Sequence, residues 1–515
     1  MRDPLILAID VGTQSVRAIA FDPTGALVAA SKVDIEPYFA AQPGWAEQEP
    51  TYYWEKLGEA CRGLMEKIPA AAIRGIALTC QRATIVNLDE RGEPLRPAMV
   101  WPDQRRVSGE APIGGAWGIL FRVAGVRETV ARFQADAEGN WLRKHQPEIW
   151  RKTAHYLLLS GYITQRLVGR YVDSVGCQVG YIPFDFKRLK WAKPGDWKWQ
   201  ATNLEPRTLP ELVQPTGELG RISAEAAAAT GLPEGTPLIA AASDKACEVL
   251  GAGCVSPDAA CLSFGTTATI NTTSPRYVEV IPLVPPFPAA TPGAYSTEIQ
   301  IWRGFWLVRW FINELAAGER AEAAAAGVSV ESLLEREIQG IAAGSDGLIH
   351  LPTWSPGAGA GPEARGALIG LTENHTRAHI YRALIEGLIY ALRAGKERTE
   401  GRTGAAIKTV RVAGGGSKSD VAMQITADVF GHPVARPHTS EASALGAAIV
   451  AAVGLGLHPD VVSAARAMTR PGDRFEPQAD AQRTYDALYR EVYRPLYGRL
   501  EPLYRKLRSI TGYPP

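Results

Sequence analysis

The chain has 515 residues, of which 46% are hydrophobic and 21% are charged, and its formal net charge is +1. A chain of this length exceeds what one hydrophobic core usually serves, so we expect two large domains in an ordinary globular protein. The near-zero charge provides no electrostatic footprint for nucleic acid or an anionic membrane, and it favours a small-molecule partner.

The chain opens with a strand, a tight turn and a second strand. Residues 5–9 and 16–21 are apolar and flank a turn that contains Gly12 and Thr13. Glycine lets the backbone approach a phosphate closely, and backbone N–H groups with a threonine hydroxyl suit an anion. Asp10, at the end of the first strand, can hold a magnesium ion through water. A purely structural β-turn is the alternative interpretation.

The amino terminus and the cysteines indicate the compartment. Asp10 interrupts the only early apolar stretch and no small-residue cleavage site follows, so we expect no signal peptide and a cytoplasmic protein. The six cysteines form no CxxC pair, and none lies beside a histidine at metal-ligand spacing. We therefore expect buried free thiols rather than a zinc site.

The first half alternates strands with helices, which is typical of the α/β class. Residues 54–67 and 150–167 have apolar side chains at helical spacing, and residues 73–78 form an apolar run typical of a strand. A buried strand at residues 237–242 ends in Ser243-Asp244, and a helix is expected to follow. We place the domain boundary near residues 251–258, so the domains span 1–253 and 254–515.

The second half repeats the opening pattern. Residues 263–268 form another turn after an apolar strand, with Gly265 and Thr266 in the places of Gly12 and Thr13. Two such turns, one domain apart, indicate a pair of phosphate clamps and an ATP-splitting cleft. Residues 282–293 are rich in proline and predict a surface excursion.

Further along, residues 357–366 predict a flexible glycine-rich loop, residues 376–400 a long helix and residues 409–413 a strand. Residues 414–416 are three glycines that lead from that strand into another helix. This arrangement suits a nucleotide, because no side chain blocks the backbone and helix-terminal N–H groups are free. A plain helix-entry loop is the alternative.

Two helices are expected near the carboxy terminus. Residues 442–457 are apolar and nearly uncharged but shorter than a membrane span, so they predict a buried helix. An aromatic and aliphatic stripe at helical spacing follows, and we interpret it as packing against the body of the protein; its members are Tyr485, Leu488, Tyr489, Val492, Leu496 and Tyr497.

The chain resembles the FGGY carbohydrate kinases over nearly its whole length, through seven motifs in that family's order. These are Asp10-Val11-Gly12-Thr13; Pro43-Gly44-Trp45-Ala46-Glu47-Gln48-Glu49-Pro50; Trp101-Pro102-Asp103-Gln104-Arg105-Arg106; Ser243-Asp244; Gly265-Thr266-Thr267; Gly366-Ala367-Leu368-Ile369-Gly370-Leu371 before the helix with Glu386; and Gly414-Gly415-Gly416-Ser417 with Gln424, Ala427 and Asp428. No single motif is decisive, but seven in order are highly specific.

The resemblance implies an α/β chain of two ribonuclease H-like (actin-like ATPase) domains with an interdomain cleft. Sugar would bind mainly to the first domain and ATP mainly to the second. Asp244 matches the catalytic base that accepts the proton of the attacking hydroxyl, a role that a positioned carboxylate can fill. From the residues alone, the alternative is that Ser243 and Asp244 only cap the next helix.

The same resemblance assigns the nucleotide site. Asp10 would lie near Mg²⁺, and the ATP-binding residues would be Gly12, Thr13, Gln14, Gly265, Thr266, Gly415, Gly416, Ser417 and Ser419. Ser419 stands where relatives often carry an asparagine directed at the adenine, and this departure leaves the base contact open.

The sugar pocket is expected to include Gln81, Arg82, Trp45 and Asp103, because hydroxyls need paired donors and acceptors and a CH face stacks on an aromatic ring. Residues 81–84 resemble the glycerol kinase stretch Gln-Arg-Glu-Thr, but Ala83 replaces its glutamate. The Gln-Met-His of xylulose kinases is also missing. Ordinary packing is the alternative for Trp45.

We therefore expect an ATP-dependent kinase that uses magnesium and phosphorylates a terminal hydroxyl of a small sugar or polyol, with open-chain pentuloses favoured. The rival is an actin-fold ATP-binding protein, such as a chaperone-like ATPase or a sugar sensor, without sugar chemistry. Nucleic acid and membrane are not expected partners. The resemblance implies a homodimer, although no stretch of the sequence isolates an interface.

Overall fold

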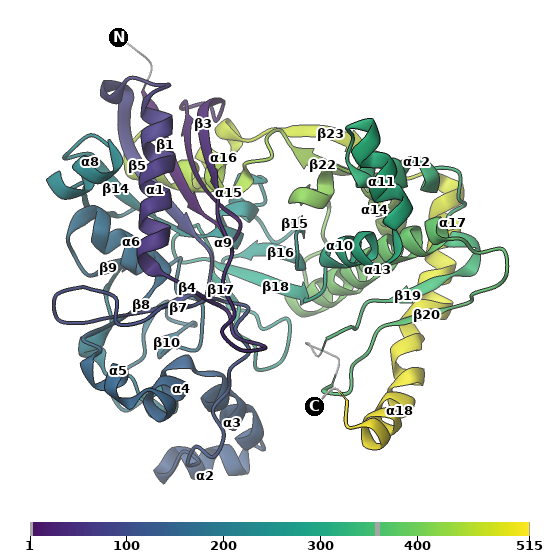
Figure 1. Cartoon of the computed structure of the whole chain (residues 1–515), viewed down its shortest axis with the longest axis horizontal. Helices are drawn as coiled ribbons and strands as arrows, with labels where there is room; N and C mark the ends of the chain where they lie inside the picture. Colours follow the sequence, from purple (N-terminus) through teal and green to yellow (C-terminus); the bar gives the residue numbers. More distant parts are fainter. Residues whose placement is uncertain (1–3, 356–360, 514–515) are drawn as a thin grey trace.

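The computed structural model describes residues 4–355 and 361–513. The chain forms two lobes, with the amino-terminal half on the left of Figure 1 and most of the carboxy-terminal half on the right. Residues 357–360 of the expected glycine-rich loop lie outside the described residues. Within the described chain, no helix is both long and apolar enough to cross a membrane.

The first lobe is built on a six-stranded sheet. Its order is β13 (Glu218–Arg221), β14 (Pro237–Ser243), β5 (Ile73–Cys80), β1 (Leu5–Val11), β2 (Ser15–Phe21) and β3 (Leu27–Asp34). The first three strands in sequence form antiparallel hairpins, whereas β5 runs parallel to both β1 and β14. The carboxyl ends of β1, β5 and β14 therefore lie along one edge.

The second lobe repeats this topology in a seven-stranded sheet. Its order is β17 (Phe287–Pro288), β18 (Tyr295–Ile301), β16 (Ala268–Ser274), β15 (Ala259–Phe264), β21 (Thr409–Ala413), β22 (Val434–Pro437) and β23 (Pro471–Phe475). Here β15 pairs with β16 as β1 does with β2, and β21 lies parallel beside β15 as β5 does beside β1. The duplicated strand–turn–strand pattern predicted from the sequence is confirmed.

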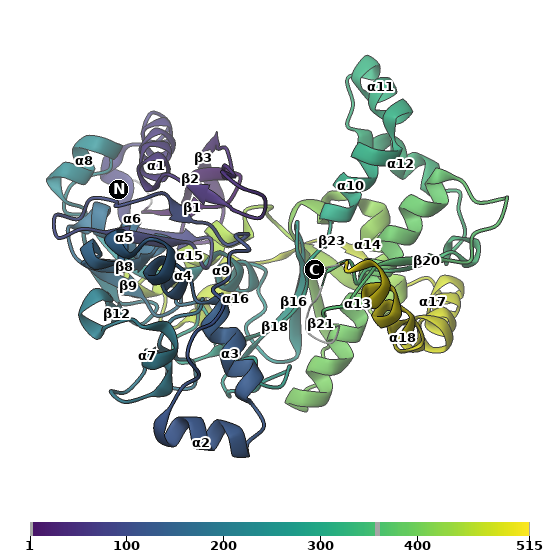
Figure 2. The ribbon, with the colours of Figure 1, turned by 60° about the horizontal axis from the view of Figure 1, so that its bottom comes forward.

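Helices cover the sheets and bury apolar side chains against them. On the first sheet these are α1 (Pro50–Met65) and α6 (Leu159–Val168). On the second they are α10 (Trp306–Leu315), α13 (Arg377–Thr403) and α14 (Asp420–Phe430). Figure 2 also shows α11 (Ala317–Ala326) and α12 (Val330–Ile338) projecting from the second lobe.

The other face of the first sheet is covered by helices from two distant parts of the chain. Beside α9 (Asp244–Gly251) lie α15 (Ala442–Gly454) and α16 (Val461–Met468), which return to the first lobe after most of the second has been traversed (Figure 1). The predicted buried helix at residues 442–457 is confirmed as α15. Its alanines pack against buried residues of the first sheet, including Ile6, Phe21 and Ile239.

The α9 and α15 helices meet almost backbone to backbone. A Cβ atom added at Gly446 would lie 1.9 Å from the carbonyl oxygen of Cys247, and one added at Gly251 would lie 1.9 Å from that of Ala442. Only glycine fits at these two positions, because any side chain would have to displace a neighbouring backbone.

We expect Gly446→Ala to lower the free energy of unfolding by about 1–3 kcal/mol, since the methyl group overpacks this contact. Gly498→Ala is the matched control: Gly498 is exposed on α18 (Arg494–Thr511), nothing lies within 4 Å of its added Cβ, and alanine favours helix. The control should raise stability by roughly 0.5–1 kcal/mol. Urea unfolding of both variants measures this, and equal effects would contradict the expectation.

The helix expected at residues 150–167 is wrong in its middle. The structure has α5 (Pro147–Lys152), then β8 (His155–Leu158), then α6. Strand β8 pairs antiparallel with β6 (Ile85–Leu88) in a small sheet that also contains β4 (Glu47–Gln48) and β7 (Ala98–Met99). A short apolar run fits both the helical and the strand period, and pairing with a partner strand decides which of the two structures forms.

The expectation for the carboxy-terminal stripe is met, and the one for residues 282–293 is met in part. The carboxy-terminal stripe does pack on the protein body, because its members Tyr485, Tyr489 and Leu496 are buried and the rings of the two tyrosines contact Tyr390 of α13. The surface excursion expected at residues 282–293 holds at its two ends, where residues 282–284 and 292–293 are exposed. Its middle is partly buried, and Phe287–Pro288 forms the edge strand β17, which pairs with β18.

Candidate active site

The site begins where the three parallel strands of the first sheet end. Val11 of β1 lies opposite Cys80 of β5, and Cys80 lies opposite Ser243 of β14. The residues that follow these three are Gly12, Gln81 and Asp244. Ligands of open parallel sheets bind at this carboxyl edge. The fold therefore brings predicted phosphate, sugar and catalytic residues to one edge.

Asp244 is the first residue of α9. One carboxylate oxygen, Oδ1, accepts a hydrogen bond from the backbone N–H of Lys245 at 2.7 Å, and in the described chain Oδ2 accepts none. Burial raises the pKa of Asp244, while Arg82 and Lys245 oppose that rise. The Ser243 side chain makes no capping bond. A carboxylate with one unengaged oxygen and a raised pKa has the properties of a general base.

Asp10 is buried at the end of β1. Burial raises its pKa to about 7, Arg17 acts against this, and Asp244 adds to it. The Arg17 guanidinium Nη1 lies 3.7 Å from Asp10 Oδ2 and 2.9 Å from Oε2 of Glu441, just before α15. No group of three or more His, Cys, Asp or Glu side chains that could hold a metal occurs among residues 4–355 and 361–513. One carboxylate is nevertheless compatible with Mg²⁺, which keeps several waters and binds nucleotide phosphates.

A chain of side-chain hydrogen bonds joins the first hairpin to β5. Trp101 Nε1 donates to Thr13 Oγ1 at 2.9 Å, Thr13 Oγ1 donates to Gln81 Oε1 at 3.0 Å, and Gln81 Nε2 donates to the Tyr53 hydroxyl at 3.0 Å. Both Thr13 and Gln81 were predicted from the sequence, Thr13 as an ATP-binding residue and Gln81 as a sugar-binding residue. Trp101 was not, although it begins the motif from which Asp103 was chosen.

Arg82 connects the lobes. Its two terminal nitrogens donate to the Glu298 carboxylate of β18 at 3.0 and 3.1 Å, and its guanidinium lies 5.2 Å from the centre of the Phe287 ring. Asn271 of β16 also donates to Glu298, at 3.0 Å. Sequence reasoning missed Glu298, because it lies 216 residues from Arg82 and no motif marks it.

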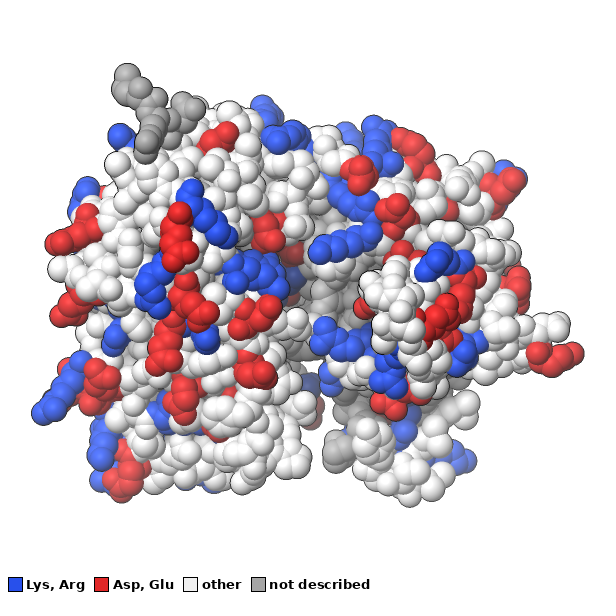
Figure 3. All heavy atoms as spheres, turned by 45° about the horizontal axis from the view of Figure 1, so that its top comes forward, with Lys and Arg blue, Asp and Glu red and all other residues white. Residues whose placement is uncertain are grey.

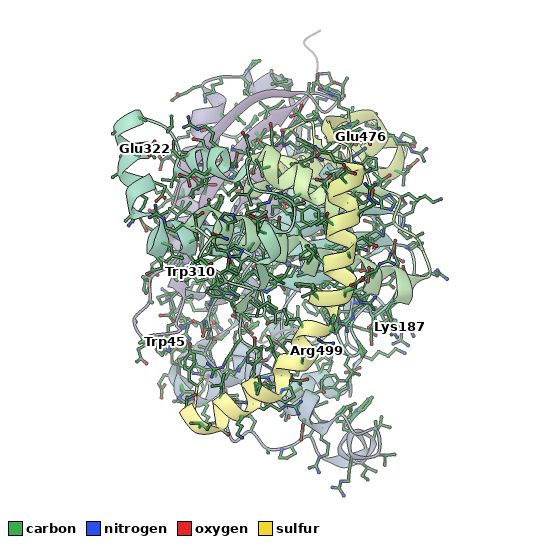
Figure 4. All side chains as sticks on the ribbon, turned by 90° about the vertical axis from the view of Figure 1, so that its right-hand side faces the viewer. Trp45, Lys187, Trp310, Glu322, Glu476 and Arg499 are labelled. Atoms are coloured by element: carbon green, nitrogen blue, oxygen red, sulfur yellow. The ribbon has the colours of Figure 1, made fainter. Side chains whose placement is uncertain are left out.

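Trp45 and Asp103 lie in a separate cluster. Asp103 accepts hydrogen bonds from Arg105 and from the backbone N–H of Ala46, and the Arg105 guanidinium lies 4.1 Å from the Trp45 ring centre and 4.6 Å from that of Trp141. In the described chain neither residue bonds to Asp10, Gln81, Arg82 or Asp244. Figure 4 shows Trp45 near one edge of the molecule, with Lys187 on the opposite side.

This cluster borders a pocket of 540 Å³. Its lining combines indole rings with cationic and amide side chains, namely Gln42, Trp45, Arg105, Arg106, Trp141, His145 and Gln146. The predicted sugar residues are thus divided between two places: Gln81 and Arg82 lie beside Asp244, whereas Trp45 lines this pocket and Asp103 pairs with Arg105, which also lines it.

Glu138, which lies near that cluster, makes the stability of the folded chain depend on pH. It begins α4 (Glu138–His145), its Oε2 is buried and has no hydrogen-bond partner in the described chain, and burial raises its pKa from 4.5 to about 8, with Asp103 and Asp136 adding to the rise. A carboxyl group with a higher pKa in the folded state binds its proton more tightly when folded. The folded state therefore loses stability as the pH rises from about 4.5 to about 8.

We expect the stability advantage of Glu138→Gln over the natural chain to grow by roughly 2–3 kcal/mol between pH 5 and pH 8. Urea unfolding at several pH values measures it. Glu148→Gln, on exposed α5, serves as the control and should show a flat difference. An advantage that is constant with pH would contradict this assignment.

The second hairpin is fixed by the start of α10. Backbone N–H groups of Gly304 and Phe305 donate to the carbonyls of Thr266 and Gly265, each at 2.9 Å. These bonds occupy the carbonyls of the turn, and Thr266 is exposed. In the first hairpin, the Gly12 N–H donates to the Ser15 carbonyl at 3.1 Å, and Gln14 is exposed.

The glycine turn after β21 is open at one of its three glycines and closely packed at the other two. Gly414 has φ of +87°, a Cβ at Gly415 would meet nothing within 4 Å, and one at Gly416 would strike the Phe305 ring. Ser417 Oγ donates to the Gly414 carbonyl at 2.7 Å. Ser419 caps α14 by accepting from the Ala422 N–H at 3.1 Å, so its hydroxyl already has a structural role.

Comparison with known proteins places this geometry in a family. Residues 5–251 match the N-terminal domain of the FGGY family of carbohydrate kinases, and residues 260–455 match its C-terminal domain. The chain is 28% identical to the uncharacterized sugar kinase YgcE of Escherichia coli, over 99% of this chain and 96% of that protein. It is 29% identical to the glycerol kinase of Alkalilimnicola ehrlichii, over 93% and 96% of the two chains.

A solved structure agrees with this. The crystal structure of xylulose kinase from Rhodospirillum rubrum is 26% identical to this chain, covers 97% of it with 100% of its own length, and superposes with a TM-score of 0.80. The two-domain actin-like ATPase fold expected from the sequence is thus confirmed. Because the two family matches together cover most of its length, the chain belongs to the FGGY family of carbohydrate kinases.

Proposed function

We propose that this kinase transfers the γ-phosphoryl group of magnesium-ATP to a terminal hydroxyl of an open-chain pentulose or a related polyol. The observation that carries this proposal is the register of β1, β5 and β14, because it puts Gly12, Gln81 and Asp244 side by side at one sheet edge. Asp244 supplies the base, and Gln81 and Arg82 supply donors and acceptors for hydroxyl groups.

In the proposed reaction, bound magnesium-ATP supplies the phosphoryl group and leaves as ADP. The Asp244 carboxylate orients the substrate hydroxyl and accepts its proton. The raised pKa of Asp244 favours that transfer. Arg82 has two of its terminal nitrogens engaged by Glu298, so its remaining N–H groups are those available to the sugar.

The nucleotide would lie between the lobes. We assign the phosphates to Gly12, Thr13, Gln14, Gly265 and Thr266, and Mg²⁺ to Asp10. The adenosine would follow the turn formed by Gly415, Gly416, Ser417 and Ser419. The space-filling view shows a groove between the halves of the molecule, with acidic and basic side chains interspersed over that face (Figure 3).

Trp45 and Asp103 remain proposed sugar residues, and their pocket is where a longer substrate would extend. We also propose that residues 1–253 form the sugar-binding unit and residues 254–515 the nucleotide-binding unit. A cytoplasmic homodimer completes the proposal. Size-exclusion chromatography with light scattering tests the dimer.

The experiment that tests the function is sugar-stimulated ADP release with magnesium-ATP. The panel includes D-xylulose, L-xylulose, D-ribulose, L-ribulose, glycerol, erythritol and several hexitols. A strong response to one pentulose supports the proposal. A response only to glycerol or a hexitol would contradict the pentulose assignment, and hydrolysis that ignores every sugar would contradict the reaction itself.

A further inference from the structure

Lys245 occupies an unusual place, directly after the proposed base. Its Nζ donates to Glu248 Oε2 at 2.8 Å, one turn along α9, and to Ser263 Oγ in the second lobe. Ser263 Oγ in turn donates to Glu248 Oε1 at 3.1 Å. The three side chains form a closed triangle in which each contacts the other two.

This triangle lies between the proposed base and the turn that would hold the phosphates. Ser263 is the penultimate residue of β15 and stands two positions before Gly265 of the second hairpin. Lys245 follows Asp244 on α9. The ammonium group is therefore held between the helix that carries the base and the turn that would hold the phosphates. In the proposed reaction, the γ-phosphoryl group would move from this turn toward the hydroxyl held by Asp244.

The ammonium group of Lys245 is charged and has one N–H donor left to bind a ligand. Burial alone would lower the pKa of Lys245, but the carboxylates of Glu248 and Asp244 outweigh burial and raise it, so the side chain is a cation at neutral pH. It has three donors, two of which bond to Glu248 and Ser263, and within the described chain no acceptor takes the third. The side chain is 22% exposed, so a ligand can reach it.

We propose that Lys245 is a further catalytic residue, whose third N–H donates to a non-bridging oxygen of the γ-phosphoryl group. In the step, the substrate oxygen forms a bond to the γ-phosphorus, the bond to the β,γ-bridging oxygen breaks, and ADP takes the electron pair. The substrate proton passes to Asp244. Lys245 keeps all its protons and stabilises the charge spread over the equatorial oxygens. Glu248 and Ser263 are positioning residues.

The proposal rests on the proposed phosphoryl transfer, but it predicts a binding signature that needs no sugar. ADP lacks the γ-phosphoryl group, so Lys245 should distinguish an ATP analogue from ADP. If the triangle served only to tie the lobes together, both nucleotides would be affected equally.

The test compares Lys245→Met with the natural chain. Calorimetry with Mg²⁺ measures the dissociation constants of ADP and of the non-hydrolysable β,γ-imido analogue of ATP. We expect the analogue to bind about 10- to 100-fold more weakly and ADP to change less than about twofold. Lys245→Arg, which keeps the charge, should recover much of the loss. With a responding sugar, kcat of Lys245→Met should fall about 10²- to 10³-fold while the sugar KM changes little.

The controls separate the possible causes. Lys56→Met removes a lysine from an i,i+3 pair of the same 2.8 Å length on α1, and it should leave both nucleotide affinities unchanged. Ser263→Ala and Glu248→Gln should weaken the analogue less than Lys245→Met does, because they only displace the ammonium group. Equal losses for ADP and the analogue, or a loss confined to the sugar KM, would overturn the proposal. A natural chain without sugar-dependent ADP release would contradict the proposed function, while the nucleotide comparison would still decide the role of Lys245.

Discussion

Asp244→Asn is expected to lower kcat about 10²- to 10⁴-fold, because asparagine cannot accept the proton of the attacking hydroxyl. Asparagine keeps the shape of the side chain and an oxygen for the backbone N–H of Lys245. We therefore expect the dissociation constant of ADP to change little. Steady-state kinetics with the responding sugar and calorimetry with ADP measure the two quantities.

The control for this variant is Asp196→Asn. Asp196 caps α7 (Trp197–Thr202) in the same lobe by accepting from the Lys198 N–H, and it stands away from the sheet edge that carries Asp244. If Asp244 only capped its helix, both variants would change stability by less than about 0.5 kcal/mol and leave kcat near normal, because asparagine caps a helix about as well as aspartate does. Near-normal turnover of Asp244→Asn would remove the assignment of the base.

Glu298→Ala is expected to lower the free energy of unfolding by about 3–5 kcal/mol, since it leaves the Arg82 guanidinium buried without its carboxylate. The side chain of Arg82 is 16% exposed and that of Glu298 is 6% exposed, so water cannot easily replace the lost carboxylate. Burial would raise the pKa of Glu298, but Arg82 holds it below its ordinary value, which marks a charged partner. Urea unfolding followed by tryptophan fluorescence measures the loss.

A surface pair and a double variant complete that experiment. Glu148→Ala breaks an exposed pair with Arg151 and should cost at most about 1 kcal/mol. Arg82→Met combined with Glu298→Leu should cost less than either single change, because no unpaired charge remains. A Glu298→Ala effect no larger than that of the surface control would show that water or another group satisfies Arg82.

Local patterns predicted most of the sheet scaffold. Strand β21 matches the expected residues 409–413, and α13 extends the expected helix by only a few residues, because both sequences have one clear period. The stretch at 150–167 failed because the identity of β8 depends on β6, a partner that local spacing does not reveal.

In the candidate site, too, the sequence marks some residues, whereas others matter only through contacts with distant segments. Asp10 and Asp244 stand at the ends of predicted apolar strands, and Gln81 begins a stretch that resembles one in glycerol kinases, so the sequence marks all three. Glu298 and Ser263 do not stand out, because their importance comes from pairing with Arg82 and Lys245 across the lobes. Contacts between distant segments are set by the folded topology, and residue spacing carries no record of them.

The return of α15 and α16 to the first sheet has a consequence for biosynthesis. A ribosome releases β1, β5 and β14 long before residues 442–468, so one apolar face of the first lobe is covered only by α9 while the second lobe is being made. The lobes therefore cannot mature in order of synthesis, and the growing chain must keep that face from aggregating until the last quarter emerges. A chain stopped after residue 253 would carry the proposed base on an unfinished core.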